Sequence, residues 1–237
     1  MIAIVDYGLG NLTSVKNALD TLGVENRVTA LKKDIVTSKG IILPGVGAAG
    51  VGMLNLRKKK LDSLLIEQIK RGKPFLGTCL GMQLLFEYSE EDNTKCLGIL
   101  RGKVKKFQTK LKVPQIGWNN VRITNYPSRR GRAEADELRI TNEIKDNSYF
   151  YYVNSYYCIP EDKNTVVGTT EYGVTFASVI QKDNIYATQF HSEKSGEAGL
   201  QLLKNFCSIA EDWIPGSPPG MTLGRPPSDR TQGKQIL

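Results

Sequence analysis

The residues of this chain best suited to chemistry are one cysteine and the single histidine. Cys79 stands in P-F-L-G-T-C-L-G-M-Q, and His191 stands in Q-F-H-S-E, with Glu193 two residues further on. The thiolate is the effective nucleophile of a cysteine, and an imidazole beside it can move the protons that its reactions require. In an extended segment, residues two apart project to the same side, so Glu193 is placed to orient His191 and to support its charged form. These three side chains predict a nucleophilic triad.

The sequence around Cys79 predicts the element that presents the thiol. Residues 74–77 have the pattern of a short buried strand, and the apolar spacing over 80–86 predicts a helix. A strand, a sharp turn and a helix form the elbow of serine hydrolases, here with cysteine at its tip. Gly77 and Gly81 flank the turn, where residues without a Cβ allow close approach. The start of the helix also favours a thiolate, because its unpaired N–H groups and its dipole stabilise negative charge.

Strand and helix patterns alternate through the first hundred residues. Strands are predicted over residues 2–6, 24–28, 40–43 and 75–77, and helical spacing is longest over 54–69. This alternation predicts an α/β fold with a mostly parallel central sheet flanked by helices, in which sites gather at the carboxyl ends of strands. Later strand patterns predict an additional antiparallel section, and they cover residues 113–123, 149–155, 165–170, 175–181 and 185–189. A final amphipathic helix is predicted over 195–210.

Two glycine-rich stretches allow more than one interpretation. D-Y-G-L-G-N-L-T has two glycines of a dinucleotide fingerprint, but Thr13 stands in place of the third, which favours a plain strand-to-helix turn. P-G-V-G-A-A-G-V-G-M lacks the lysine and hydroxyl residue of a phosphate-binding loop. Its N–H groups can stabilise an oxyanion, which needs donors but no particular side chain. An oxyanion-binding segment and a simple glycine turn both remain open for this stretch.

Length and composition predict one catalytic domain over residues 1–210. Residues 127–143 are poor in core residues and predict a surface excursion, and the proline and glycine content after 210 predicts a disordered tail over 211–237. The net charge of +8 comes from scattered lysines and arginines without interleaved aromatics, so we expect no nucleic-acid binding. A basic docking face for a partner protein that handles a phosphorylated substrate is the alternative use of this charge.

The four cysteines and the chain start indicate where the protein works. The cysteines at 79, 96, 158 and 207 form no paired framework, and with one histidine they offer no metal-ligand spacing, so no metal is expected. No apolar run is long enough for a membrane span, and the chain begins with strand-like sequence in place of an export signal. We therefore expect a cytoplasmic protein without a membrane association.

Four segments in order carry a specific resemblance. They are P-G-V-G-A, G-T-C-L-G-M-Q-L-L-F, V-P-Q-I-G-W-N and Q-F-H-S-E-K-S-G, and together they resemble the class I glutamine amidotransferases, most closely the glutaminase subunits of imidazole glycerol phosphate synthase. The resemblance extends from residue 1 to about 210, weakens over 127–143 and is absent from the tail. It implies the sandwich-like α/β fold of that family.

The resemblance also implies a division of labour among the residues. Cys79 would attack the carboxamide of glutamine to form a thioester and release ammonia, while His191 moves protons and Glu193 orients it. No cofactor is implied. Ammonia would pass to a separate cyclase subunit that makes imidazole glycerol phosphate in histidine biosynthesis, so the functional unit would be a heterodimer. The family's oxyanion donors correspond to the backbone of Leu80, Gly45, Val46 and Gly47, and its glutamine pocket to Gly47, Gln83, Glu91, Ser155 and Tyr156.

Three positions depart from the family pattern. The usual H-P-E is His191, Ser192 and Glu193 here, which keeps the triad but removes a rigid turn residue. Gln115 and Asn154 stand where histidine-pathway members commonly carry histidine. These two leave open a paralogous glutaminase that supplies ammonia to a synthase of bacterial surface sugars. A non-catalytic subunit would lack a triad member, and an esterase or peptidase would not need Gln83 or V-P-Q-I-G-W-N.

Overall fold

Short strands form a parallel sheet at the centre of the molecule. The computed structural model describes residues 1–124 and 139–216, and in it this sheet has the order β2-β1-β3-β4-β13 with every neighbouring pair parallel. All of these strands except the edge strand β2 are wholly buried, as expected for strands covered on both faces. Their bounds are Ile2–Val5 (β1), Asn26–Thr29 (β2), Gly40–Leu43 (β3), Phe75–Thr78 (β4) and Ile185–Thr188 (β13).

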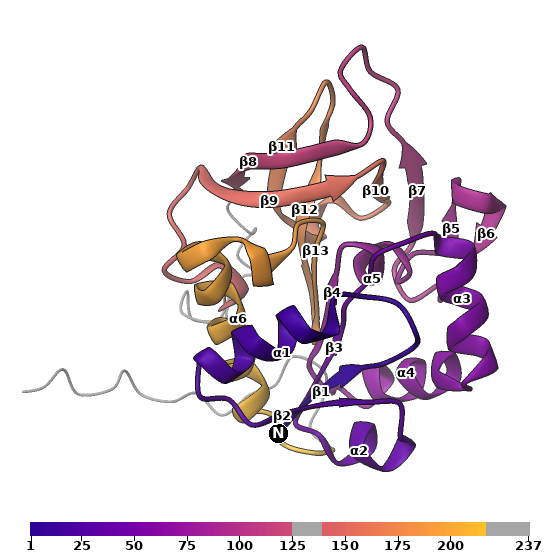
Figure 1. Cartoon of the computed structure of the whole chain (residues 1–237), viewed down its shortest axis with the longest axis vertical. Coiled ribbons are helices and arrows are strands. Elements are labelled where there is room, and N and C mark those ends of the chain that lie inside the picture. Colours follow the sequence, from indigo (N-terminus) through magenta and orange to yellow (C-terminus); the bar gives the residue numbers. More distant parts are fainter. Residues whose placement is uncertain (125–138, 217–237) are drawn as a thin grey trace, which may run out of the picture.

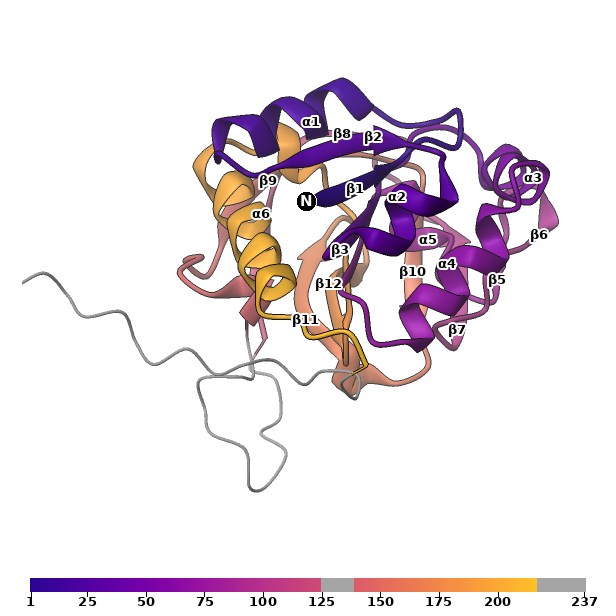
Figure 2. The same cartoon turned by 90° about the horizontal axis from the view of Figure 1, so that it is seen from below.

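Helices cover both faces of this sheet (Figures 1 and 2). The side chains of Ile4 and Ile42 lie in one core cluster with helices α1 and α6, and those of Val5 and Ile41 lie in the other with α2, α3 and α4. Alternate residues of each strand therefore supply opposite cores. The helices span Leu12–Thr21 (α1), Lys32–Thr37 (α2), Ala49–Lys58 (α3), Leu61–Lys70 (α4), Leu80–Gln83 (α5) and Gly196–Glu211 (α6). This arrangement confirms the predicted α/β fold.

An antiparallel section continues the sheet beyond β13, as predicted. Strand β12 pairs antiparallel with β13, β10 pairs with β12 and β7, and β11 joins β12 to the hairpin of β8 and β9. In Figure 1 that hairpin lies across the end of the parallel sheet at which the carboxyl ends of its strands meet. The strands span Tyr88–Ser89 (β5), Thr94–Lys95 (β6), Gly102–Lys106 (β7), Gln115–Ile123 (β8), Ser148–Asn154 (β9), Tyr156–Pro160 (β10), Val166–Glu171 (β11) and Thr175–Lys182 (β12).

Several element boundaries differ from the predictions. The helix expected over 54–69 is two helices, because Lys60 between them adopts a left-handed φ of 55°. The second half of the glycine-rich turn, from Ala49, is the first turn of α3. Helix α5 ends at Gln83 and does not continue to residue 86. Short 3-10 helices, which were not predicted, span Glu91–Asn93 (η1), Arg139–Thr141 (η3), Lys163–Thr165 (η4) and Ser192–Lys194 (η5).

The predicted excursion and tail fall largely outside the described residues. Of the excursion, residues 139–143 are described, and they pack on α6: Asn205 donates to the carbonyl oxygens of Ile140 and Asn142 at 3.0 and 2.7 Å. Of the tail, the described residues end at 216, and the ring of Trp213 lies 5.2 Å from the ammonium of Lys73. Within both described ranges, no helix combines the length and the apolar character that a bilayer crossing requires.

Candidate active site

The parallel strands bring four distant segments to one edge of the sheet. Tyr7, Gly45, Cys79 and Gln189 each follow within two residues of the carboxyl end of a parallel strand, in β1, β3, β4 and β13 respectively. The pairing of β4 with β13 brings Cys79 close to the segment that leads to His191. The N–H of Cys79 donates to the carbonyl oxygen of Thr188 at 2.7 Å. This one strand pair therefore brings together residues that lie more than a hundred positions apart in the sequence.

The backbone at Cys79 forms a sharp elbow. Cys79 has φ 53° and ψ −111°, a conformation that costs free energy for a residue with a side chain and persists only where the surroundings impose it. Close packing at Gly81 is one such constraint, because a Cβ there would lie 1.8 Å from the carbonyl oxygen of Leu43. At Gly77 a Cβ would lie 2.7 Å from the carbonyl oxygen of Gly81. Both glycines are therefore required for α5 to sit this close to the sheet.

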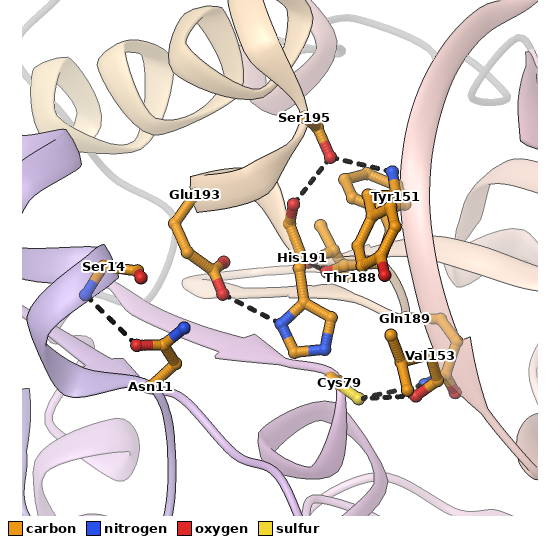
Figure 3. Close-up of polar contacts among 11 residues, drawn as sticks. Asn11, Ser14, Cys79, Tyr151, Val153, Thr188, Gln189, His191, Glu193 and Ser195 are labelled. Carbon is orange, nitrogen blue, oxygen red and sulfur yellow. Dashed lines mark hydrogen bonds and ion pairs between the residues drawn. The ribbon is translucent and has the colours of Figure 1, made fainter. Parts of the chain in front are cut away.

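His191 and Glu193 meet beside the thiol. The Nδ1 atom of His191 lies 2.9 Å from Oε1 of Glu193, and both side chains are buried. Figure 3 shows the opposite edge of the imidazole turned toward Cys79. The contact arises differently from the prediction: Glu193 lies in η5, a short 3-10 helix, and not in an extended segment. Ser195 fixes the start of this turn by donating from Oγ to the carbonyl oxygen of His191 at 2.6 Å.

The charged form of His191 is favoured by its two neighbours. Burial alone lowers the pKa of an imidazole, but hydrogen bonding with Cys79 and Glu193, and the negative charges these groups carry when ionised, raise the pKa of His191 to about 10. An imidazolium next to the sulfur stabilises a thiolate by the same interaction. The arrangement therefore places a nucleophile beside a proton carrier, and the proton carrier beside an orienting carboxylate.

A cavity of about 220 Å³ opens beside Cys79. It receives residues from the glycine-rich segment, the elbow, η1 and the β8–β10 region, so it joins the parallel sheet to the antiparallel section. Every side chain predicted for the glutamine pocket lies on its wall, and so do Val46 and Leu80. The full lining is Val46, Gly47, Cys79, Leu80, Gln83, Glu91, Pro114, Val153, Asn154, Ser155 and Tyr156.

Glu91 supplies the carboxylate of this cavity. One of its oxygens, Oε2, accepts a hydrogen bond from the N–H of Ala49 at 2.7 Å, which fixes the acidic run of η1 against the start of α3. Burial raises the pKa of Glu91; the hydrogen bond from Ala49 lowers it, and the charge of Asp92 raises it. A half-buried carboxylate on the wall of a cavity is suited to an ammonium group.

The backbone donors predicted for an oxyanion lie on two sides of Cys79. Leu80 opens α5, and the N–H of a first helical residue has no partner inside its helix. Among the described residues, no group accepts a hydrogen bond from the N–H of Leu80, Val46 or Gly47. Gly45 lies behind them: a Cβ on it would be 2.6 Å from the Cβ of Leu80, so the absent side chain lets the two segments touch.

The three departures from the family pattern have defined places. Gln115 and Asn154 are direct cross-strand partners in the hairpin of β8 and β9, and both are buried. Asn154 also lines the cavity and donates to the carbonyl oxygen of Tyr156 at 3.0 Å. Ser192 opens η5 and is buried, so the turn after His191 forms without proline. The first two departures are thus one paired feature of the cavity wall.

Two groups next to Cys79 were missed by the sequence reasoning. Nε2 of Gln189 lies 3.8 Å from the sulfur, and the carbonyl oxygen of Val153 lies 3.7 Å from it (Figure 3). Gln189 stands two residues before His191 at the end of a strand, which was a signal that could have been used. A backbone carbonyl such as that of Val153 leaves no signal in a sequence. Over the described residues, no group of three or more histidine, cysteine or acidic side chains is arranged to hold a metal ion.

The fold and the site define an α/β protein with a cysteine at a nucleophile elbow. The family model described as "Glutamine amidotransferase class-I" matches residues 3–210. The chain belongs to the class I glutamine amidotransferase family.

Relatives with high identity share one name. The chain is 47% identical to "Imidazole glycerol phosphate synthase subunit HisH" of Bacillus cytotoxicus, over 90% of this chain and 97% of that protein. It is 46% identical to the protein of the same name from Dehalococcoides mccartyi, over 89% of this chain and 98% of that one.

Solved structures agree on the fold. A chain titled "Crystal structure of glutamine amidotransferase" superimposes with a TM-score of 0.68 at 16% identity, covering 89% of this chain and 98% of that one. "Structure of PurLQS from Thermotoga maritima" gives a TM-score of 0.67 at 18% identity, covering 87% and 97%. At these identities the likeness concerns the fold alone.

Proposed function

We propose that this protein is the glutaminase subunit of an imidazole glycerol phosphate synthase, and that it hydrolyses glutamine and delivers the ammonia to a cyclase subunit. The observation that carries the chemistry is the thiol of Cys79 at a left-handed elbow, beside an imidazole that Glu193 holds at 2.9 Å. The name shared by relatives at 46–47% identity supports the choice of synthase and hence of a heterodimer with a cyclase.

The reaction follows from the positions of the three side chains. The thiolate of Cys79 attacks the carboxamide carbon of glutamine, and the N–H groups of Leu80 and of the segment around Gly47 stabilise the oxyanion. His191 gives its proton to the departing nitrogen, so ammonia leaves and a thioester remains. His191 then takes a proton from water, the resulting hydroxide attacks the thioester, and the sulfur departs as thiolate with release of glutamate. Glu193 keeps the imidazole oriented throughout.

The cavity supplies the contacts that select glutamine. Glu91 offers its carboxylate to the α-ammonium group, and Gln83 offers an amide. The walls formed by Ser155, Tyr156 and Gly47 complete the pocket. No cofactor or metal takes part in this scheme, because each proton and bond is handled by side chains or backbone.

The relatives' names favour this assignment over the paralogue that serves surface-sugar synthases. Gln115 and Asn154, which left that alternative open, face each other in one strand pair. All four cysteines are free and buried, and thiols persist in a reducing compartment, so we expect the protein to act in the cytoplasm. The domain of residues 1–210 stays a prediction.

Replacing Cys79 by alanine tests the mechanism. With the cyclase partner present, Cys79→Ala should lower ammonia release from glutamine at least about a thousandfold, since the nucleophile of a triad cannot be substituted by its neighbours. Cys96→Ala is the matched control, because Cys96 is equally buried but lies outside the cavity, and its release should stay near the wild-type rate. Circular dichroism checks that both variants fold. Undiminished release by folded Cys79→Ala would rule out the proposed thioester.

A further inference from the structure

A row of amide groups connects the cavity wall to the sulfur of Cys79. Nε2 of Gln83 donates to the carbonyl oxygen of Tyr156 at 3.2 Å and to Oε1 of Gln189 at 3.1 Å. Nε2 of Gln189 in turn lies 3.8 Å from Sγ of Cys79. Asn154 donates to the same carbonyl of Tyr156 at 3.0 Å. Two buried glutamines therefore link the carbonyl of Tyr156 to the sulfur of Cys79.

The orientation of Gln189 follows from the fixed end of this row. The carbonyl of Tyr156 can only accept, so the amide group of Gln83 must present its nitrogen to it. The same nitrogen carries a second hydrogen, which points at Gln189, so the atom of Gln189 facing it must be the oxygen. The remaining atom of the Gln189 amide, which faces Cys79, is then the N–H donor.

The surroundings of the sulfur make this donor significant. As a thiol, Cys79 has an acceptor in the carbonyl oxygen of Val153 at 3.7 Å and a donor in Gln189 (Figure 3). As a thiolate, Cys79 has no proton to donate to this carbonyl oxygen, which then repels the negative sulfur. The thiolate still accepts from the Gln189 donor and from the imidazolium of His191. Hydrogen bonding to the charged form of a group favours that form.

We propose that Gln189 stabilises the thiolate of Cys79 through its amide N–H, and that Gln83 acts as a positioning residue by holding that amide in its donating orientation. The inference deepens the glutaminase function proposed above and rests on it. Gln189 has 0% of its surface exposed, and a fully buried amide costs free energy unless its polar atoms are used. Gln83 also lines the cavity, so substrate contact and nucleophile stabilisation share one side chain.

The pH dependence of Cys79 alkylation tests this role in the complete chain without partner or glutamine. Iodoacetamide reacts with thiolates, and the Cys79 peptide is followed by mass spectrometry apart from those of the other cysteines. Gln189→Met keeps the shape and removes the donor; we expect the midpoint of the profile to rise by about one pH unit, so that alkylation below the midpoint slows about tenfold while the high-pH plateau is kept. Gln83→Met should raise the midpoint by less.

Gln68→Met is the matched control, because Gln68 is a buried glutamine of α4 outside the cavity. Its profile should match the wild type. The titratable groups whose charges couple to Cys79 are His191, Tyr7 and Cys158, and all variants retain them. Thermal unfolding shows which variants are folded, and Gln83→Met provides the test if Gln189→Met does not fold.

Two results would overturn the inference: an unshifted midpoint in the folded variants, or a loss of plateau rate without a shift, which would indicate a packing role alone. Neither result concerns the glutaminase proposal, which Cys79→Ala tests separately. With the cyclase present, Gln189→Met should lower kcat for ammonia release about tenfold and leave KM for glutamine nearly unchanged, since Gln189 touches the nucleophile and does not line the cavity.

Discussion

At the scale of single residues, the histidine is the group whose chemistry the surroundings change most. Its ring is buried, which opposes charge, yet Cys79 and Glu193 raise the pKa of His191 to about 10. The imidazolium is therefore the form of His191 expected at neutral pH. Because the chain contains one histidine, this state can be observed without interference from any other.

Glu193→Gln should lower the pKa of His191 measured by NMR titration of the imidazole signals in protein without a histidine tag. The folded-state pKa lies above the ordinary value of 6.5, so the pairing stabilises the fold fully below about pH 6.5 and loses its effect as pH rises toward 10. The difference in unfolding free energy between wild type and variant should thus be largest in mild acid and shrink in base. A difference that grew with pH would contradict the assignment.

The sequence was informative about these residues to different degrees. The spacing of His191 and Glu193 predicted their contact, although the backbone between them turned out to be a 3-10 turn. The thiol at a strand-to-helix turn was predicted because glycines mark such turns. Gln189 was missed although it stands two residues before His191, whereas Val153 could not be recognised, since it faces the sulfur with its backbone carbonyl.

At the scale of elements, the elbow depends on the contact of α5 with β3. A Cβ at Gly81 would lie 1.8 Å from the carbonyl oxygen of Leu43, and a backbone atom cannot move aside. We expect Gly81→Ala to lower the free energy of unfolding by about 3 kcal/mol and to reduce ammonia release. Gly52→Ala on α3 is the control, because its Cβ would meet side-chain carbons and no backbone, with Leu84 at 3.2 Å, Leu80 at 3.5 Å and Tyr7 at 3.6 Å.

Urea unfolding measures both variants. The control should be neutral or slightly stabilised, since alanine is a better helix former than glycine. Equal stability of Gly81→Ala and the wild type would show that α5 can shift away from β3, and the close approach would then not be what imposes the backbone of Cys79.

Strands β1, β3, β4 and β13 and helix α6 were predicted because their apolar residues form clear runs or repeat with a clear period, whereas β10 and α2 were not predicted. Strand β7 was missed, because among its five residues only Val104 is buried and the others are lysines and a glycine. The break between α3 and α4 was missed since apolar spacing continues across it, while Lys60 interrupts the backbone. A strand made of polar residues has no apolar pattern to reveal it, and a single residue with an unusual φ can end a helix without changing the apolar spacing.

At the scale of the molecule, the fold leaves an apolar face next to the active site. The hairpin of β8 and β9 turns the side chains of Ile116, Trp118, Tyr149 and Val153 outward, and the first three are 61, 56 and 62% exposed. The carbonyl of Val153 meanwhile reaches Cys79. Exposed apolar clusters on a folded protein mark binding surfaces, so this face is where we expect the cyclase to dock and receive ammonia.

Trp118→Ala should therefore weaken binding of the cyclase subunit by at least about 30-fold, as loss of a central tryptophan typically costs about 2 kcal/mol or more. Isothermal titration with the purified cyclase measures the affinity, and the variant should keep its unfolding midpoint because Trp118 is exposed. Leu31→Ala is the control: Leu31 is 66% exposed, but it precedes α2, far from the hairpin in Figure 1. Equal affinities for all three proteins would place the docking surface elsewhere, and ammonia would then need another exit from the cavity.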